Sequence, residues 1–164
     1  MTSIGQVGEE STDTIDLSGA KVTFVPMDSA ASYSLTEWDI PPGWQSPPIH
    51  VHRASAEGFY VLAGQFGFVL DGVTTYARQG AHVLVPSGHP HSFWNAGPRP
   101  AKCLLIVSPP GLEQYFRALA AALGGIRSAE ASLAARMKLS EKYDMEVVGP
   151  FPDMTAASLE GSRD

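Results

Sequence analysis

The sequence has little of several features that mark particular classes of protein. It contains one cysteine in 164 residues, so no disulfide can form within the chain, and this suits a reducing cytoplasm. Its 11 lysines and arginines form no basic cluster and are outnumbered by 17 acidic residues, which argues against a nucleic-acid-binding surface. No apolar run approaches the length of a membrane span, and the first fifteen residues lack the apolar core of a signal peptide. We therefore expect a cytoplasmic protein with neither nucleic acid nor membrane as a partner.

What the chain does contain is enough apolar material for one core. Hydrophobic residues make up 44% of the sequence, so a single domain is the default expectation at this length. Cys103 lies in the apolar run 103–107. We interpret its thiol as buried and inert rather than as a nucleophile.

The densest group of potential ligands is His50-Val51-His52, followed by Glu57. Successive residues of a strand point to opposite faces, so the two imidazoles lie on one face, about 6 to 7 Å apart along the strand. Residues 53–56 are enough for a turn and too few for another element. We therefore expect the chain to reverse there and return antiparallel to the histidine strand, with Glu57 opening the neighbouring strand and aimed at the same point.

A further histidine, His91, lies in a second segment. It follows residues 86–90, which read Pro-Ser-Gly-His-Pro and favour a turn, so a second hairpin can carry it. Three imidazoles and one carboxylate are a ligand set for a divalent first-row metal. A lone histidine in a strand is more often a packed or surface residue, but packing gives no reason to place all four groups on one inward face. His82 alternates with the apolar Val83 and Val85 along its strand, so its side chain should face outward, and His89 lies in the turn. Neither is assigned as a ligand.

The two segments resemble the two motifs of the cupin superfamily. In the first, Glu57 and Gly64 keep the usual spacing after H-x-H, whereas Gly43 stands one residue further from the first histidine than usual. The second motif is matched at Gly80, Pro86, Gly88, His91 and Asn95. The short spacer between the motifs is similar to that of microbial single-domain cupins, and residues 108–116 resemble quercetin-dioxygenase-type cupins. The likeness covers residues from about 20 to 110.

The chain between these motifs predicts an all-β fold. About ten short apolar runs alternate with Gly and Pro turns, which is typical of a jelly roll. The expected strands are 21–25, 33–40, the histidine strand, 58–70 with a bend at Gly64, 73–77, 81–85, 92–94 and 102–107. The resemblance implies the same architecture, a double-stranded β-helix (jelly-roll or cupin) barrel, whose small cavity would receive the metal ligands.

We divide the chain into a mobile leader at 1–15, a cupin barrel at 16–110, a C-terminal helical extension at 111–152 and a flexible tail at 153–164. In the extension, apolar residues recur at three- and four-residue steps until Gly124-Gly125, which predicts an amphipathic helix. A second helix is expected from an N-cap at Ser128 to about Tyr143. Both should pack on the barrel. The first either covers its mouth as a lid, or the two helices bury apolar barrel surface or a dimer face.

The predicted ligands occupy four positions and leave one or two open on a five- or six-coordinate ion. Iron or manganese is favoured as the cofactor, with nickel, cobalt or zinc as alternatives. Parity places Phe59 and Val61 on the face of Glu57, and Phe93 and Asn95 on the face of His91. The full set of pocket candidates is Phe59, Val61, Phe68, Phe93, Tyr33, Trp38 and Phe116. Arg53, Arg78 and Arg99 are scattered over turn-like segments, which gives no ring of cations for a phosphorylated sugar.

An apolar, aromatic-lined cavity with one cationic centre suits a small aromatic or enolic substrate. By the resemblance, an O₂-dependent dioxygenase is the first hypothesis, with Glu57 as both ligand and catalytic proton acceptor. A non-oxidative isomerase, cyclase or lyase needs the same four ligands and is the second. The third is a small-molecule-binding module without turnover, because a fold does not fix a function. The resemblance also implies a homodimer.

Overall fold

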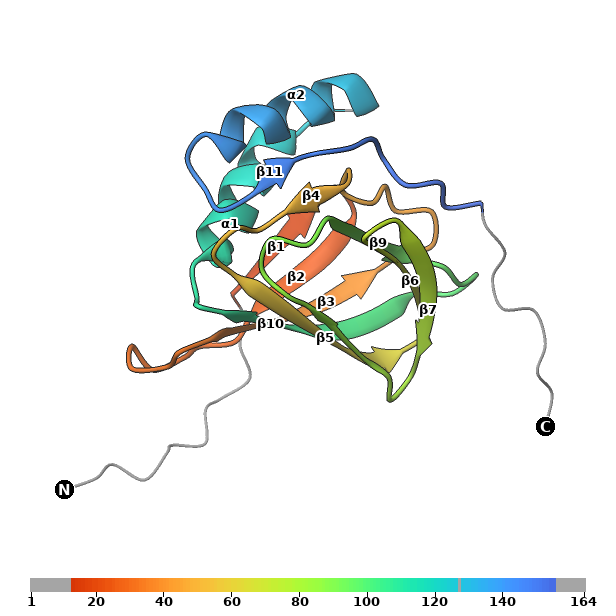
Figure 1. Ribbon diagram of the computed structural model, residues 1–164, viewed down its shortest axis with the longest axis horizontal. Coiled ribbons are helices and arrows are strands. Elements are labelled where there is room, and N and C mark those ends of the chain that lie inside the picture. Colours follow the sequence, from red (N-terminus) through yellow and green to blue (C-terminus); the bar gives the residue numbers. More distant parts are fainter. Residues whose placement is uncertain (1–12, 127, 156–164) are drawn as a thin grey trace.

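The computed structural model describes residues 13–126 and 128–155, which form two antiparallel sheets packed face to face with two helices at one end (Figure 1). The strands are β1 (Thr14–Leu17), β2 (Ala20–Phe24), β3 (Ser34–Ile40), β4 (His50–Val51), β5 (Ala56–Ala63), β6 (Gln65–Leu70), β7 (Val73–Arg78), β8 (His82–Val85), β9 (His91–Asn95), β10 (Ala101–Ser108) and β11 (Glu146–Val147). One sheet has the order β1-β2-β3-β10-β5-β8, and the other β11-β4-β9-β6-β7. The predicted jelly-roll fold is therefore confirmed.

The core lies between the two sheets because the strands alternate. In β3, the even-numbered residues from Ser34 to Ile40 are buried and the odd-numbered ones are partly exposed. Strand β10, which pairs with β3 and β5, alternates in the same way and buries Cys103 completely. Burial raises the pKa of this thiol well above its ordinary value, and nearby Glu57 adds to the effect. The thiol is therefore an inert core residue, as predicted.

The two expected hairpins at the ligand segments are wrong. Strand β4 lies in the five-stranded sheet and β5 in the six-stranded sheet, so residues 52–55 cross from one sheet to the other. Strand β4 pairs with β9, His50 opposite His91, and with β11. Strands β8 and β9 also belong to different sheets. His50 and His91 are therefore neighbours within one sheet, and Glu57 reaches them from the opposite sheet instead of from a shared hairpin.

The carboxylate of Asp144 holds the crossing between β4 and β5. It accepts hydrogen bonds from the backbone N–H groups of Arg53 (2.7 Å), Ala54 (3.2 Å) and Ser55 (2.9 Å). These groups have no strand partner, so the distant acceptor satisfies them without a hairpin. The Asp144 side chain, from the C-terminal part of the chain, thus fixes the path of residues 53–55, which the local sequence predicted to be a turn.

The N-terminal boundary lies earlier than predicted. The leader was expected to reach residue 15, but Thr14 and Ile15 belong to β1 and pair with β2. A tight turn joins the two strands, with Ser18 and Gly19 at positive φ, and the Gly19 N–H donates to the Asp16 carboxylate. The remainder of the expected leader, 1–12, and the tail at 156–164 lie outside the described residues.

The C-terminal extension contains the two predicted helices, α1 (Leu112–Leu123) and α2 (Ala129–Ser140), which lie together beside β4 and β11 (Figure 1). The Ser128 hydroxyl accepts from the Ala131 N–H and caps α2, as expected. The extension was predicted to be helical, but it also contains strand β11, which pairs with β4 beside His50. Neither helix in the described part of the chain is long and apolar enough to cross a membrane.

Candidate metal centre

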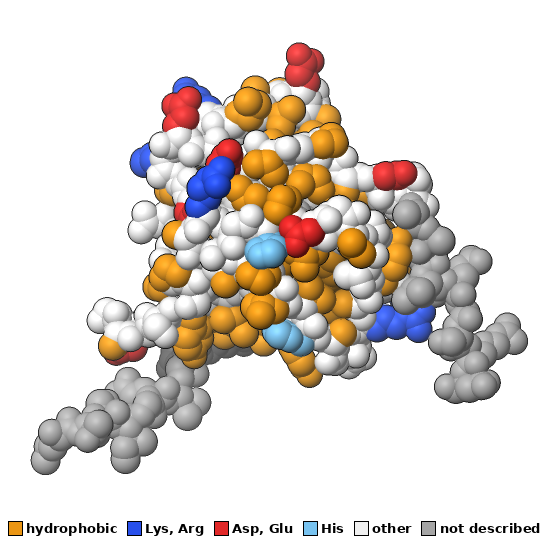
Figure 2. Space-filling model, viewed as in Figure 1, with side chains coloured by type: hydrophobic (Ala, Val, Ile, Leu, Met, Phe, Trp, Pro, Cys, Tyr) orange, Lys and Arg blue, Asp and Glu red, His pale blue; other side chains and the backbone are white. Residues whose placement is uncertain are grey.

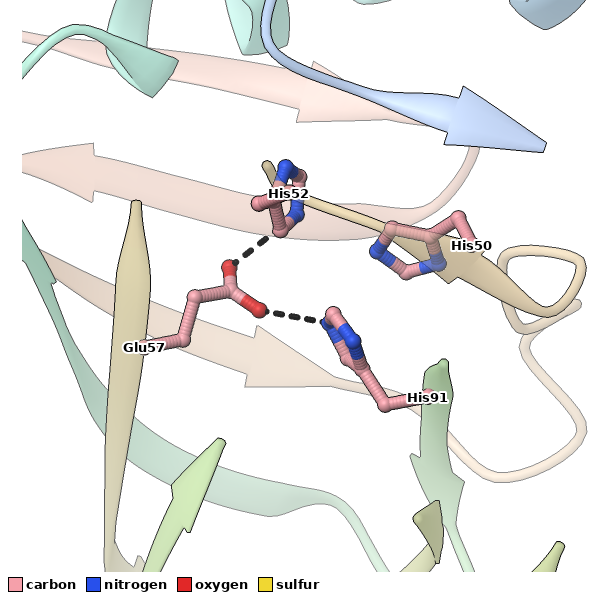
Figure 3. A group of neighbouring side chains, drawn as sticks. All are labelled: His50, His52, Glu57 and His91. Carbon is pink, nitrogen blue, oxygen red and sulfur yellow. Dashed lines mark hydrogen bonds and ion pairs between the residues drawn. The ribbon is translucent and has the colours of Figure 1, made fainter. Parts of the chain in front are cut away.

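Four buried side chains from separate segments meet inside the sandwich (Figure 3). His50 comes from β4, His52 from the crossing segment, Glu57 from the start of β5 and His91 from the start of β9. Their potential ligand atoms all lie within 4.8 Å of one another. Each side chain is 5% exposed or less. The group that the sequence predicted as ligands is therefore assembled in one place.

Each imidazole is oriented by a backbone carbonyl. The Nδ1 atom of His50 lies 2.9 Å from the Pro48 oxygen, and that of His91 lies 2.9 Å from the His89 oxygen. The Nδ1 atom of His52 contacts the Asp144 oxygen. A carbonyl can only accept, so Nδ1 carries the proton in each ring and Nε2 is left as the candidate ligand atom. Such partners fix the tautomer and direction of metal-bound histidines.

Glu57 is the electrostatic centre of the group. Its carboxylate lies 2.7 Å from the His91 Nε2 atom and 3.7 Å from the His52 Nε2 atom. Burial alone would raise the pKa of Glu57, but the electrostatic interaction with His52 and the hydrogen bond with His91 outweigh it and lower that pKa. Burial likewise opposes a charge on His91, yet the contact with Glu57 raises its pKa. Burial and the two neighbouring imidazoles lower the pKa of His50 well below its usual value.

These features fit a divalent metal ion. Three imidazole nitrogens and one carboxylate oxygen are the donor set preferred by first-row divalent metals, and no thiolate lies among them. A lowered carboxylate pKa and a neutral His50 give those two groups the protonation states that ligands need. The residues could therefore hold one ion through three Nε2 atoms and Glu57, and the identity of the metal is not fixed by this donor set.

A small cavity of about 30 Å³ lies beside three of the four ligands, His50, His52 and Glu57. Its wall is mostly apolar and aromatic and includes Leu17, Trp38, Trp44, Pro47, Phe93, Leu105, Tyr115, Phe116, Leu119, Arg136 and Met145, together with His50, His52 and Glu57. Trp38 meets Phe93 and Phe116 edge to face, with ring centroids 5.7 and 5.1 Å apart. Of the predicted pocket residues, Trp38, Phe93 and Phe116 thus line the cavity.

The other pocket candidates lie elsewhere. Phe59, Val61 and Phe68 are buried in the same interior, on the predicted inward face, but outside the cavity wall. The Phe59 and Phe68 rings pack together with centroids 5.1 Å apart and fill the space that a deeper pocket would need. Tyr33 is 42% exposed. It has the opposite strand parity to Trp38, so its placement in the pocket was wrong.

Several residues of the cavity wall were not predicted from the sequence, and they lie outside the strands of the barrel. Trp44 precedes β4, Tyr115 belongs to α1, Arg136 to α2, and Met145 precedes β11. Tyr115 shares the apolar spacing of α1, which was a usable signal. Arg136 gave none, because an arginine in a polar helix is ordinarily solvent-exposed. His82 and His89 are exposed, as predicted, and His89 pairs with Asp71 at 2.7 Å. Exposed histidine side chains are visible in pale blue on the face drawn in Figure 2.

The chain is similar to cupins in its fold and in its ligand geometry. Residues 36–107, a little under half of the chain, match the model of the family described as Cupin domain. Among curated proteins, 77 residues are 32% identical to an uncharacterised protein of Methanocaldococcus jannaschii, covering 47% of this chain and 61% of that protein. A stretch of 46 residues is 39% identical to quercetin 2,3-dioxygenase of Bacillus subtilis, covering 28% of this chain and 14% of that enzyme. The chain thus spans less than two thirds of either relative.

Solved structures show the same fold over nearly the whole chain. A variant of Streptomyces PAC13 with uridine aligns over 95% of this chain and 98% of that one, with a TM-score of 0.57 and 18% identity. A cupin domain from Schizosaccharomyces pombe aligns over 76% and 84%, with a TM-score of 0.53 and 18% identity. At such identities the likeness concerns the fold alone.

Proposed function

We propose that the protein is a metal-dependent enzyme that acts on a small aromatic or enolic molecule, with dioxygenation as its reaction. The observation that carries this proposal is the position of the four-ligand group, which opens directly onto an apolar, aromatic-lined cavity. The partial similarity to quercetin 2,3-dioxygenase supports the oxidative assignment. Iron or manganese is the proposed metal, because both suit a nitrogen- and oxygen-ligated site with open positions.

The chain's own residues would bind, shield and deprotonate the substrate. A divalent ion held by the ligand group supplies Lewis-acid and redox chemistry at a substrate oxygen. Trp38, Phe93 and Phe116 offer flat apolar surfaces to a ring and keep water out. The Glu57 carboxylate reaches the cavity, and its lowered pKa keeps it ionised at neutral pH, so it can accept a hydroxyl proton.

The first test is metal content. We expect purified protein to bind about one divalent ion per chain, and His91→Ala to lose most of it, because one of four ligands is removed. His82→Ala is the matched control, since His82 is an exposed histidine outside the group. Equal metal content in wild type, His91→Ala and His82→Ala, measured by elemental analysis, would show that the ion binds elsewhere.

The second test is oxygen consumption. Protein loaded with Fe(II) or Mn(II) should consume O₂ with an electron-rich phenol, flavonol or enol, and Glu57→Gln should abolish it. An oxygen electrode that records no consumption across such a panel would reject the dioxygenase assignment. Metal-loaded protein that converts substrate under strict anaerobiosis would instead identify an isomerase, cyclase or lyase. The Glu57 carboxylate in the cavity wall supports this second candidate, because it can accept a proton without any redox change.

We also propose that the protein forms a homodimer, as the resemblance implies. The strands β5 and β8 carry exposed apolar side chains on their outer face, including Tyr60 at 43% and Leu84 at 55% exposure. Gly58 pairs with Leu84, and Tyr60 with His82, so these side chains are neighbours on one sheet. Light scattering of the purified protein should give about twice the chain mass of 17.4 kDa.

A further inference from the structure

The wall of the cavity contains a cation that the ligand group does not explain. Arg136 lies on α2, is only 4% exposed, and lines the same cavity as His50, His52 and Glu57. Arginine is almost never this deeply buried unless it is paired. Its guanidinium stays protonated in proteins, so the charge is carried inside the wall of the cavity.

No acidic partner neutralises this charge. Within residues 13–126 and 128–155, every salt bridge involves other side chains, and none reaches Arg136. The buried Nε atom of Arg136 has no hydrogen-bond partner. Burial lowers the pKa of Arg136, which reflects the cost of keeping this charge away from water. A bound anion would remove that cost.

The hydroxyl of Tyr115 is the second unsatisfied group at this place. Tyr115 is 3% exposed and lines the cavity from α1. Within residues 13–126 and 128–155, no hydrogen-bond partner is found for its hydroxyl oxygen. The guanidinium is nevertheless close enough to influence it: burial raises the pKa of Tyr115, and Arg136 opposes that rise. Arg136 and Tyr115 therefore interact with each other at this cavity, and the Arg136 Nε–H and the Tyr115 hydroxyl are left as donors that the described residues do not fully satisfy.

We propose that Arg136 and Tyr115 bind a carboxylate of the substrate, so that the enzyme acts on small aromatic or enolic acids. A planar guanidinium matches a carboxylate and can donate two parallel hydrogen bonds to it. The remainder of such an acid would lie between Trp38, Phe93, Phe116 and the ligand group, since all of these residues line one small cavity, which has to widen to admit a ring. This inference rests on the proposed function for the reaction, but the binding of acids can be measured without turnover.

The experiment compares acids with their neutral amides. Benzoate, phenylacetate and salicylate are each titrated against benzamide, phenylacetamide and salicylamide, using full-length protein treated with chelator so that no ion can hold the carboxylate. Quenching of Trp38 and Trp44, which line the cavity, reports binding. We expect at least one acid to bind about tenfold or more tightly than its amide, because a charge-assisted bidentate pair is lost in the amide.

Three variants assign the preference to the proposed residues. Arg136→Met should reduce the acid-to-amide ratio to about one and raise the melting temperature of the free protein, because a buried unpaired charge is removed. Tyr115→Phe removes only the hydroxyl and should reduce the ratio by a smaller factor. Lys138→Met removes an exposed positive charge from the same helix and should leave the ratio unchanged. A purely structural role for Arg136 predicts the opposite change in melting temperature.

The inference is overturned if no acid binds more tightly than its amide in the wild type, or if the preference survives in Arg136→Met. If Arg136→Met does not fold, the wild-type ratio together with Tyr115→Phe decides. Metal content separates this result from the proposed function. A chain that binds one ion but does not prefer acids keeps the metal-enzyme proposal and rejects the acid substrate, and a chain that prefers acids but binds no ion does the reverse.

Discussion

At the scale of single residues, the role of each histidine depends on what its Nδ1 atom meets. The ligand types and their spacing are local, so the sequence could predict His50, His52, Glu57 and His91 as a group. The ring orientations are not local in the same way. The carbonyls of Pro48 and His89 lie two residues from the rings that they orient, but His52 depends on the Asp144 oxygen, far along the chain. No spacing rule could have identified that partner.

Close packing at Gly67 gives a prediction at this scale. A Cβ atom built on Gly67 would lie 2.3 to 2.7 Å from atoms of the buried Trp94 ring, its partner across β6 and β9. Gly67→Ala should therefore destabilise the protein by about 1 to 3 kcal/mol, since neither the ring nor the backbone can move freely in a packed interior. Urea unfolding measures the change in the free energy of unfolding.

Gly97→Ala is the matched control for Gly67→Ala. Its added Cβ atom would meet the nearest heavy atom at 3.6 Å, an ordinary contact. We expect its free energy of unfolding to stay within about 0.5 kcal/mol of wild type. Equal stability of the two variants would mean that the Trp94 ring does not cover Gly67 as closely as the structure has it.

At the scale of elements, the sequence predicted most individual strands and helices, but it did not predict which strands pair. Alternation predicted nearly every strand of the barrel, and three- and four-residue spacing predicted α1. The predicted antiparallel pairing of β5 with β4 is wrong. The backbone N–H groups of residues 53–55 donate to the Asp144 carboxylate and do not form a hairpin turn. Strand β11 was not predicted, because a strand of two residues is too short to show an alternation of apolar and polar side chains. Both errors concern long-range pairing, which short-range patterns do not encode.

Asp144 therefore provides the prediction at the element scale. Asp144→Ala leaves three backbone N–H groups without their charged acceptor and should destabilise the protein by about 1 to 3 kcal/mol, part of the loss being offset by water at the half-exposed site. It should also weaken metal binding, since the released segment carries His52 and leads into Glu57. Thermal unfolding and a metal titration measure the two effects. A variant with unchanged stability and affinity would show that the segment is held by other contacts.

Acidity changes the same contact in the wild type. Burial raises the pKa of Asp144, but hydrogen bonds from residues 53–55 more than offset it and leave that pKa below its ordinary value. A carboxyl whose pKa is lower in the folded chain stabilises it at neutral pH, and this stabilisation is lost as the pH falls through the folded-state pKa. Asp144→Asn cannot lose a charge, so its stability should decline less between pH 6 and acid than that of the wild type. Parallel pH profiles would contradict this account.

At the scale of the whole molecule, the site joins three parts of the fold. Strands β4 and β9 belong to one sheet and β5 to the other, while α1 and α2 supply Tyr115 and Arg136 to the cavity wall. The extension is therefore part of the site and not only a cover for the barrel. This explains why the sequence predicted the ligands but only part of the wall: the motifs describe residues within the barrel, and Arg136 reaches the cavity only because α2 packs against it.

Because the ligands come from both sheets, removing the metal should loosen the whole sandwich. An ion that binds only the folded state stabilises it by mass action, by about 2.7 kcal/mol when its free concentration is one hundred times its Kd. We expect chelator to lower the melting temperature of the wild type and re-added Mn(II) to restore it. In His50→Ala the melting temperature should respond to neither, whereas His89→Ala, an exposed histidine, should behave like wild type. Calorimetry at fixed pH measures these changes. If neither chelator nor metal changes the melting temperature of the wild type, the four side chains do not hold an ion that stabilises the contact between the sheets.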